Sequence, residues 1–250
     1  SDFGSGTTLN IKTVGTVTIQ DAAEDTPLNF NPIDTGNITL SITDYVGDAW
    51  KVSDDLREDG AQVDSLMSMR AMESTRALGE NHESRFLSVA NAAQTNANVN
   101  LVNGRPHRWV AGGASASTRV MTLSDFIAMK LAFDKANVPT AGRIAIVDPI
   151  VEATLNSIQN LVNVSNNPMF EGIVTEGFAK DHKFVKNIFG FDIWTSNRLA
   201  VKTATEALDA STYGLANDTA EIGDIANVFM SVADDSTKPI MHAWRRAPKT

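Results

Sequence analysis

The sequence contains no cysteine, so disulfides, thiolate metal sites and cysteine nucleophiles are excluded. No stretch approaches about 18 uninterrupted apolar residues, and the first residues lack a basic region followed by an apolar run, so we expect neither a membrane span nor a secretory signal. Basic residues are also sparse, because 21 Lys and Arg against 30 Asp and Glu give a net charge of −9. The longest basic run is the pair Arg245–Arg246, so binding to a phosphate backbone is not expected to be the main activity.

Signatures of catalysis are missing as well. The dinucleotide-binding glycine pattern, the P-loop and the Gly-x-Ser-x-Gly elbow are absent, and the four histidines are scattered at His82, His107, His182 and His242. Asp181–His182 resembles a dyad but has no identifiable nucleophile, which favours a solvated loop. Asp54–Asp55 and Asp234–Asp235 could bind a divalent ion, but helix-start and turn roles explain them without one. We therefore expect no catalytic residue, cofactor or metal.

What is present is an ordinary globular composition. The chain has 250 residues, of which 42% are hydrophobic and 20% charged, enough for one large domain or two small ones. Since disulfides are excluded, stability has to come from packing and from assembly with other chains.

The first fifty residues predict a long β-hairpin arm. Apolar residues fall on odd positions in Gly6–Gln20 and on even positions in Asn37–Val52, which is the period of a half-buried strand. The segment Asp21–Gly36 between them has no sustained period and predicts a long tip. A hairpin of two strands is marginally stable alone, so a neighbouring subunit could cover its apolar row, although an ordinary intramolecular sheet remains an alternative. The candidate inter-subunit contacts are Leu9, Ile11, Val17, Ile19, Ile38, Leu40, Ile42 and Trp50.

A long polar helix is expected next, from about Asp59 to Thr95. Asp55 followed by Glu58 resembles a capping box, and the acidic residues around them suit the positive end of a helix dipole. A thin apolar stripe is interrupted by Arg70, Ser74 and His82, so one face packs and the rest meets solvent or neighbours. At ~1.5 Å per residue the helix would span on the order of 50 Å, longer than a compact domain needs. A bend or break at Gly79 is the alternative. The stripe consists of Val63, Leu66, Met67, Ala71, Ala77, Leu78, Phe86, Leu87 and Ala90.

A second domain is predicted after a linker at Asn96–Ser117, with the boundary near residue 120. Thr122 and Asp125 begin a helix that stops before Val138–Pro139. Arg143–Val147 suits a buried strand, and Asp148–Pro149 supplies an N-cap and first-turn proline for a helix over Ile150–Leu161. Further strands are expected at Phe184–Ile188, Phe191–Thr195, Ile225–Val232 and Pro239–Trp244, with turns near Gly190 and at Asp234–Lys238. The second domain should combine helices with a central sheet.

The order of arm, long helix, linker, Arg143–Pro149 and Asn187–Asn197 resembles the major capsid proteins of tailed phages. In that family a basic residue, a short apolar strand and Asp-Pro precede a helix, and a Gly-Phe-x-Ile/Val-x-x-Ser-Asn segment follows a loop. Both patterns occur here, at Arg143–Pro149 and Gly190–Asn197, in the right order. The resemblance implies an α+β fold of the Hong Kong 97 type, with an extended β-hairpin arm, a long spine helix and a mixed α/β axial domain.

The resemblance also implies a domain plan. Residues 1–55 would form the N-terminal segment and arm, 56–120 the spine helix and linker of the peripheral domain, 121–244 the axial domain, and 245–250 the start of a return to the peripheral domain. Family members can have a longer segment before the arm and more chain after Trp244, so trimmed or incomplete ends are expected here. Some members join subunits through a lysine-asparagine isopeptide bond, for which Lys12 is the arm's only strand lysine, without an identified partner or activating acid.

The function that the resemblance implies is a major capsid protein that self-assembles through hexamers and pentamers into an icosahedral phage head enclosing double-stranded DNA. Partners would be other copies of the chain and, in addition, a scaffolding protein, portal, maturation protease or decoration protein, with assembly in the bacterial cytoplasm and no membrane. Two alternatives stay open. A nanocompartment shell of the encapsulin type shares the fold, and a soluble α/β enzyme would use Asp148 at the end of an apolar strand.

Overall fold

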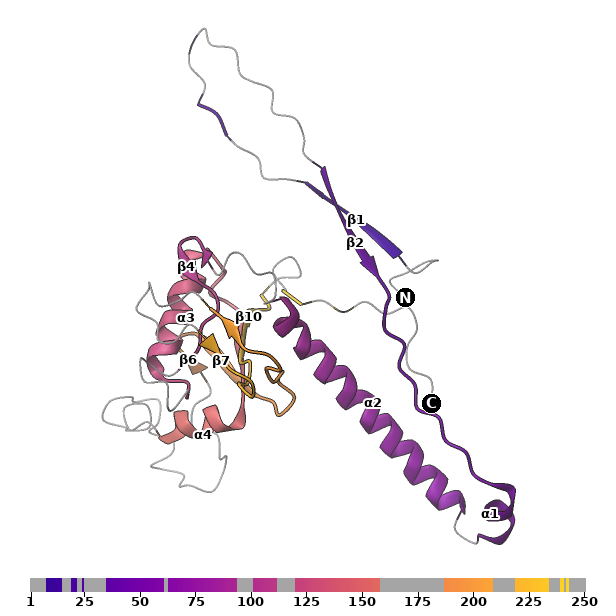
Figure 1. Ribbon diagram of the computed structural model, residues 1–250. Coiled ribbons are helices and arrows are strands. Elements are labelled where there is room, and N and C mark those ends of the chain that lie inside the picture. Colours follow the sequence, from indigo (N-terminus) through magenta and orange to yellow (C-terminus); the bar gives the residue numbers. More distant parts are fainter. Residues whose placement is uncertain are drawn as a thin grey trace. The chain divides into compact units, whose positions relative to one another are not determined.

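The computed structural model describes residues 8–14, 19–21, 24, 35–60, 63–93, 101–111, 120–157, 187–208, 219–233, 239–240 and 242. The chain forms two compact units. Unit 1 is Ser1–Leu78 with His242–Thr250, and unit 2 is Gly79–Met241. The division falls inside the long helix α2, and each unit is described by itself below (Figure 1).

Unit 1 contains the expected hairpin. Strand β1 (Thr8–Val14) pairs antiparallel with β2 (Thr35–Ser41), with Leu9 opposite Leu40 and Ile11 opposite Ile38. Both predicted strands therefore exist and are paired, but the second ends at Ser41 instead of reaching Val52, and residues 42–53 form no helix or strand. The even positions 44 and 48 are both aspartates, which interrupt the apolar row and are depleted in strands.

The expected long helix is present as one helix, and a separate short helix precedes it. Helix α1 (Asp54–Asp59) is followed by Gly60, and α2 (Val63–Ala93) begins after it. The capping-box prediction was wrong, because Asp55 lies inside α1 and the carbonyl of Ser53 already accepts the Arg57 amide at 3.1 Å. Gly60 directly follows the end of α1 at Asp59, and glycine is unfavourable inside a helix, so continuation of α1 is disfavoured there.

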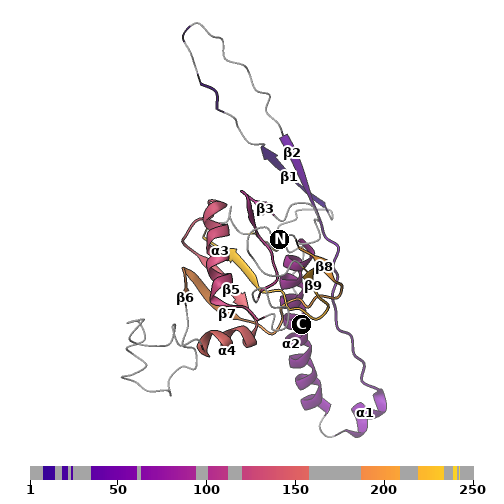
Figure 2. The same ribbon diagram turned by 60° about the vertical axis from the view of Figure 1, so that its left-hand side comes forward.

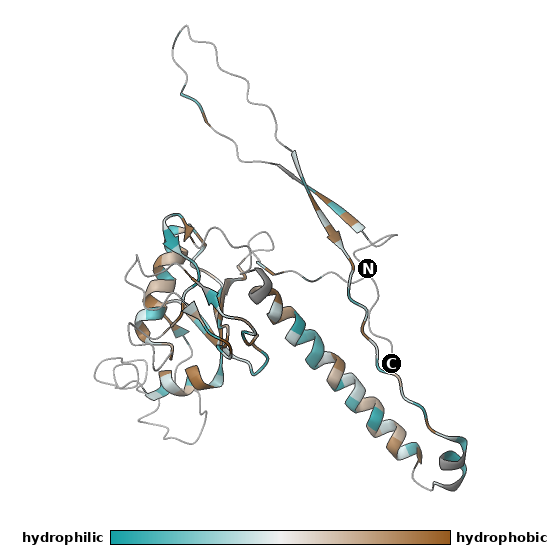
Figure 3. Ribbon diagram, in the orientation of Figure 1, coloured by the Kyte–Doolittle hydropathy of each residue, from teal (hydrophilic) through white to brown (hydrophobic). Residues whose placement is uncertain are grey.

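Helix α2 runs through Gly79 without a break, so the alternative of two shorter helices at that point does not hold. Its 31 residues span ~46 Å at the usual rise. Val63 and Leu87 are buried near its two ends, while most side chains between them are exposed or half-buried. Figure 3 shows hydrophobic residues only at separated positions along the helix, in agreement with the thin stripe.

The predicted linker contains a short hairpin, which corrects the loop prediction for part of Asn96–Ser117. Strands β3 (Leu101–Val102) and β4 (Arg105–Pro106) pair through the turn Asn103–Gly104. Both turn residues have positive φ, 48° and 74°, as a two-residue hairpin turn requires. The Asn103 side chain donates to the carbonyl of Lys135 at 2.8 Å, so the hairpin is tied to the end of the next helix.

That next helix, α3 (Leu123–Lys135), begins at Thr122 as predicted. The Asp125 carboxylate accepts hydrogen bonds from the Thr122 amide at 2.8 Å and the Thr122 hydroxyl at 2.7 Å. Strand β5 (Arg143–Val147) and helix α4 (Pro149–Ser157) also match their predictions. Residues of the predicted helix beyond Ser157 lie outside the described part of the chain.

Unit 2 is built on a mixed four-stranded sheet in the order β10-β5-β7-β6. Here β6 is Asn187–Ile188, β7 is Phe191–Thr195 and β10 is Val228–Ser231, while β8 (Glu206–Ala207) and β9 (Thr219–Ala220) form a separate pair. Strand β5 is parallel to β7 and antiparallel to β10. The predicted combination of helices with a central sheet is confirmed.

Helices α3 and α4 pack on one face of this sheet (Figure 2). The core between the helices and the sheet includes Phe126, Val147, Leu155, Phe191 and Ile193, and the rings of Phe126 and Phe191 both meet Phe229 edge to face.

The predicted turn near Gly190 is present, with positive φ at Phe189 and Gly190. Residues 184–186, the turn at 234–238 and most of the predicted strand 239–244 lie outside the described part of the chain, and the described Pro239 and Ile240 are not in a strand.

Candidate assembly site

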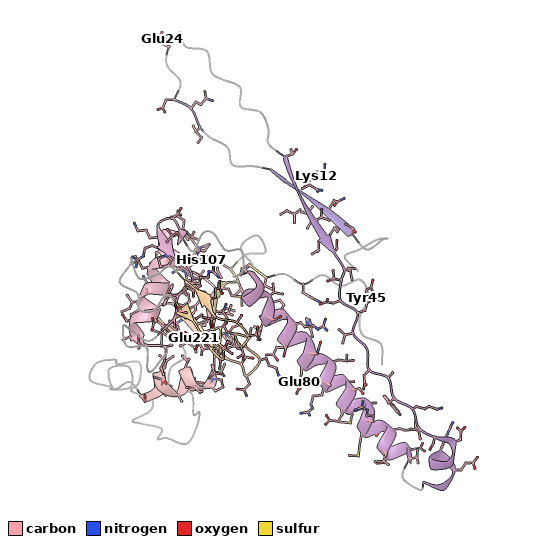
Figure 4. The ribbon with its side chains drawn as sticks, viewed as in Figure 1. Lys12, Glu24, Tyr45, Glu80, His107 and Glu221 are labelled. Carbon is pink, nitrogen blue, oxygen red and sulfur yellow. The ribbon has the colours of Figure 1, made fainter. Side chains whose placement is uncertain are left out.

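The hairpin β1–β2 has one apolar face and one polar face. Leu9 and Leu40 lie directly opposite each other, as do Ile11 and Ile38, so all four side chains share one face. Ile11, Leu40 and Ile38 are 41%, 39% and 57% exposed, and Leu9 is half-buried. On the opposite face, the three pairs from Thr8–Ser41 to Lys12–Asn37 are polar, with the residues Thr8, Asn10, Lys12, Asn37, Thr39 and Ser41. Figure 4 shows Lys12 on this hairpin.

The other predicted contact residues lie outside the paired strands. Ile19 is 91% exposed, Trp50 is 41% exposed in the segment after β2, and Ile42 is half-buried there. Val17 lies outside the described residues. The structure therefore brings Leu9, Ile11, Ile38 and Leu40 together on one surface and leaves Ile19 and Trp50 apart from the paired rows.

A polar cluster in unit 1 was not found from the sequence. The Asp48 carboxylate accepts hydrogen bonds from Arg70 Nη2, at 2.8 and 3.1 Å to its two oxygens, and from the Ser74 hydroxyl. We call this set of Asp48, Arg70 and Ser74 the Asp48 clip. Arg70 and Ser74 are two of the residues that interrupt the apolar stripe of α2. Their i, i+4 spacing places them on one face of the helix, which was the available signal.

A second apolar surface lies on the first half of α2. Leu66, Met69 and Met72 follow a spacing of three residues and are 56%, 59% and 72% exposed. Methionine is flexible and polarizable, and it is frequent at surfaces that adapt to partners. The sequence prediction placed Leu66 in the packing stripe, but in the chain alone this residue is exposed.

Unit 2 is held by a buried guanidinium. Arg143 is 2% exposed and donates to Asp134 at 2.8 Å and to the carbonyls of Pro139 and Val138 at 2.9 and 2.6 Å. Its guanidinium also lies over the Phe133 and Phe191 rings, 5.5 and 5.9 Å from their centres. The hydrogen bond from Arg143, followed by that from Lys130, holds the pKa of Asp134 below its ordinary value of 3.8.

A second charged cluster joins segments far apart in the sequence. Glu206 accepts from Arg108 Nη1 at 2.6 Å and from the Lys202 ammonium, and all three side chains are largely buried. Burial favours a raised pKa for Glu206, but the hydrogen bonds and charges of Lys202 and Arg108 outweigh it and lower the pKa below 4.5. The cluster fixes the loop that precedes β8 onto the segment after β4.

The second half of α2 carries its own polar contacts within unit 2. Glu80, labelled in Figure 4, pairs with Arg198 at 2.8 Å, and Glu83 accepts the Ser196 hydroxyl at 2.9 Å. Both partners follow β7: Ser196 belongs to the end of the Gly190–Asn197 motif, and Arg198 comes directly after it. The helix is thus attached to the end of a central strand.

Asp148, on which the enzyme interpretation depended, has a structural role. Its carboxylate accepts the Ile150 amide at 3.0 Å, its carbonyl accepts the Val151 amide at 2.9 Å, and its own amide donates to the Asn227 side chain at 2.8 Å. These bonds cap α4 as predicted.

Within the described residues, no three His, Asp or Glu side chains are grouped in a way that could hold a metal ion, and no helix is long and apolar enough to cross a membrane. Asp181, His182, Asp234 and Asp235 lie outside the described residues.

The fold is that of phage capsid subunits. The structure is similar to the capsid structure of the cyanophage P-SCSP1u, with a TM-score of 0.60 and 18% identity over 92% of this chain and 69% of that chain. It is also similar to the mature capsid of bacteriophage PhiM1, with a TM-score of 0.55 and 16% identity over 85% of this chain and 64% of that chain. The chain thus spans about two thirds of the length of these capsid subunits. No curated protein matches the sequence.

The family is established by sequence as well. The model of the family described as phage capsid protein matches residues 36–245, which is most of the chain, so this chain belongs to the phage capsid protein family. The predicted α+β capsid fold and the predicted role as a major capsid protein of a phage head are confirmed. The protein is a structural component of the capsid shell.

Proposed function

We propose that this chain assembles through hexamers and pentamers into an icosahedral shell around double-stranded DNA. In this proposal, residues 1–55 act as the arm, 56–120 as the peripheral domain, 121–244 as the axial domain and 245–250 as a return to the peripheral domain. Assembly takes place in the bacterial cytoplasm. Further partners in this proposal are a scaffolding protein, a portal, a maturation protease or a decoration protein.

The apolar face of β1–β2 carries the proposal. Ile38, 57% exposed, and Ile11, 41% exposed, face each other on a hairpin of only two strands. Such a hairpin is marginally stable in water, and its apolar face gains stability when another surface covers it. A second copy of the chain is a suitable cover, since many copies multiply modest contacts and no single interface has to be strong.

The charge of the chain supports a container for DNA. With a net charge of −9, the chain would enclose a polyanion without adhering tightly to it. The match to the phage capsid family favours this content over the enzymes of a nanocompartment. No catalytic activity is proposed, because Asp148, the residue that motivated an enzyme, serves to cap α4.

The test is assembly of the full-length protein, followed by light scattering and electron microscopy. We expect hollow shells, or capsomers of five and six copies, and nuclease-protected DNA in particles from infected cells. A compact monomer or dimer at all concentrations would contradict the proposal. Protein cargo in place of DNA in native particles would favour the nanocompartment.

A matched pair of variants tests the arm. Ile38→Asp places a charge on the apolar face of β2, where its burial against a neighbour would be costly, so shells should not form. Thr39→Asp places the same charge on the next residue, on the polar face, and should assemble normally. Equal assembly of the two variants would show that the apolar face is not an assembly contact.

A further inference from the structure

The segment between the hairpin and the first helix depends on the Asp48 clip. Residues 42–53 follow β2 without helix or strand, and most of their side chains are exposed. Asp48 lies in the middle of this segment and accepts from Arg70 and Ser74 on α2. The clip therefore joins the strand that leaves the arm to the first half of the long helix, inside unit 1.

The geometry of the clip is specific. Both oxygens of Asp48 bond the same Arg70 nitrogen, and one of them also accepts the Ser74 hydroxyl. Arg70 and Ser74 lie one turn apart, so together they define one position along the helix at which the segment is held. By contrast, Arg76, about one turn and a half further along α2, pairs with Glu73 of its own helix at 3.1 Å.

The exposure of the clip makes it able to open. The Arg70 and Asp48 side chains are 50% and 30% exposed, so water and salt screen the pair and hold it only weakly. Beside it, a Cβ on Gly47 would meet nothing within 4 Å, and glycine has the widest range of backbone conformations. A weak contact next to a glycine can release and re-form without disturbing a packed core.

We propose that the Asp48 clip is a latch that sets the position of the arm relative to α2 and releases the arm when a subunit needs another position. The proposal rests on the proposed shell, in which copies in pentamers and hexamers have different neighbours and their arms have to reach them differently. A clip that opens gives one sequence access to more than one arm position, and a closed clip keeps the free subunit uniform.

The first test uses unassembled subunits, so it does not depend on shell formation. Hydrogen exchange of the peptides covering residues 42–53 should be about two- to fivefold faster in Asp48→Asn and in Arg70→Gln, as expected from loss of a half-exposed ion pair. The control Arg76→Gln removes the same charge from the same helix and should leave this exchange unchanged. Unchanged exchange in Arg70→Gln would overturn the latch even if the wild type forms shells.

The second test measures shells. Under identical conditions, Asp48→Asn and Arg70→Gln should give a broader distribution of shell diameters than wild type and Arg76→Gln by electron microscopy. The reversed pair Asp48→Arg with Arg70→Asp should restore both a single diameter and slow exchange. Faster exchange together with an unchanged distribution of shell diameters would overturn the role of the clip in placing the arm. Failure of the wild type to form any shell would count against the proposed function. In that case the hydrogen-exchange result alone would decide whether the clip is a latch.

Discussion

Arg143 is the residue on which unit 2 depends most. It is buried, and the five groups that it contacts come from the end of α3, from the loop after α3 and from β7. Arg143→Met keeps much of the volume but leaves the carbonyls of Val138 and Pro139 without this donor. We expect a loss of about 2–4 kcal/mol in the free energy of unfolding. Thermal unfolding followed by circular dichroism measures it, with Lys130→Gln as a control that should cost only a few tenths of a kcal/mol.

The same cluster predicts a response to acid. Because Arg143 lowers the pKa of Asp134 in the folded protein, the ionised carboxylate stabilises the fold above the ordinary pKa of 3.8. This contribution is lost as the pH falls below 3.8 through the folded-state pKa. Asp134→Asn should therefore be less stable than wild type at pH 7, and the difference should shrink toward pH 2. A difference that is constant over this range would show that the ion pair does not contribute through ionisation. The side chain of Asp134 is 38% exposed, so solvent screens part of the effect.

At the scale of elements, two glycines predict opposite outcomes. Gly79 lies inside α2, where an added Cβ meets nothing within 4 Å, so Gly79→Ala should stabilise the helix by about 1 kcal/mol. Gly142 has φ +67°, and its Cβ would lie 2.8 Å from the Ala233 nitrogen, so Gly142→Ala should cost about 2 kcal/mol or more. Melting temperatures by circular dichroism compare the two. A destabilising Gly79→Ala would indicate that α2 bends at this residue in solution.

Elements with strong local signals were predictable from the sequence. Thr122 with Asp125 and Asp148 with Pro149 begin helices in the structure, because side-chain caps act within a few residues. The length of the second arm strand was not predicted correctly. Apolar residues continue on even positions to Val52, but Asp44 and Asp48 interrupt this apolar row, and the strand ends before them. The hairpin β3–β4 was missed because its strands are only two residues long, although Asn103–Gly104 is a typical turn signal.

The candidate site was only partly predictable. Alternation alone identified Leu9, Ile11, Ile38 and Leu40, and the register of the hairpin places them on one face. The Asp48 clip depends on a contact between residues 22 positions apart, and charge clusters such as Arg108 with Glu206 join residues 98 apart. Sequence periodicity carries no information about which distant charges meet, so these contacts required the fold.

For the whole molecule, assembly should be separable from folding. Trp50 is 41% exposed in unit 1, while the core of unit 2 includes Phe126, Phe191 and Leu155 and none of the residues before Gly79. Trp50→Asp should therefore block shell formation, because charge at an apolar contact is costly to bury, and should leave unit 2 folded. Sedimentation velocity measures the loss of shells, and circular dichroism with limited proteolysis measures the remaining fold.

The control for Trp50→Asp is Ser53→Asp, which adds the same charge three residues away. Ser53 directly precedes α1, and aspartate is as favourable as serine in that position, so this variant should fold and assemble like the wild type. If Trp50→Asp also gave normal shells, the contact would have to lie elsewhere, on the apolar face of β1–β2 or on the stripe of Leu66, Met69 and Met72. Failure of both variants would instead show that added negative charge opposes assembly, as self-repulsion predicts for a chain that already carries a net charge of −9.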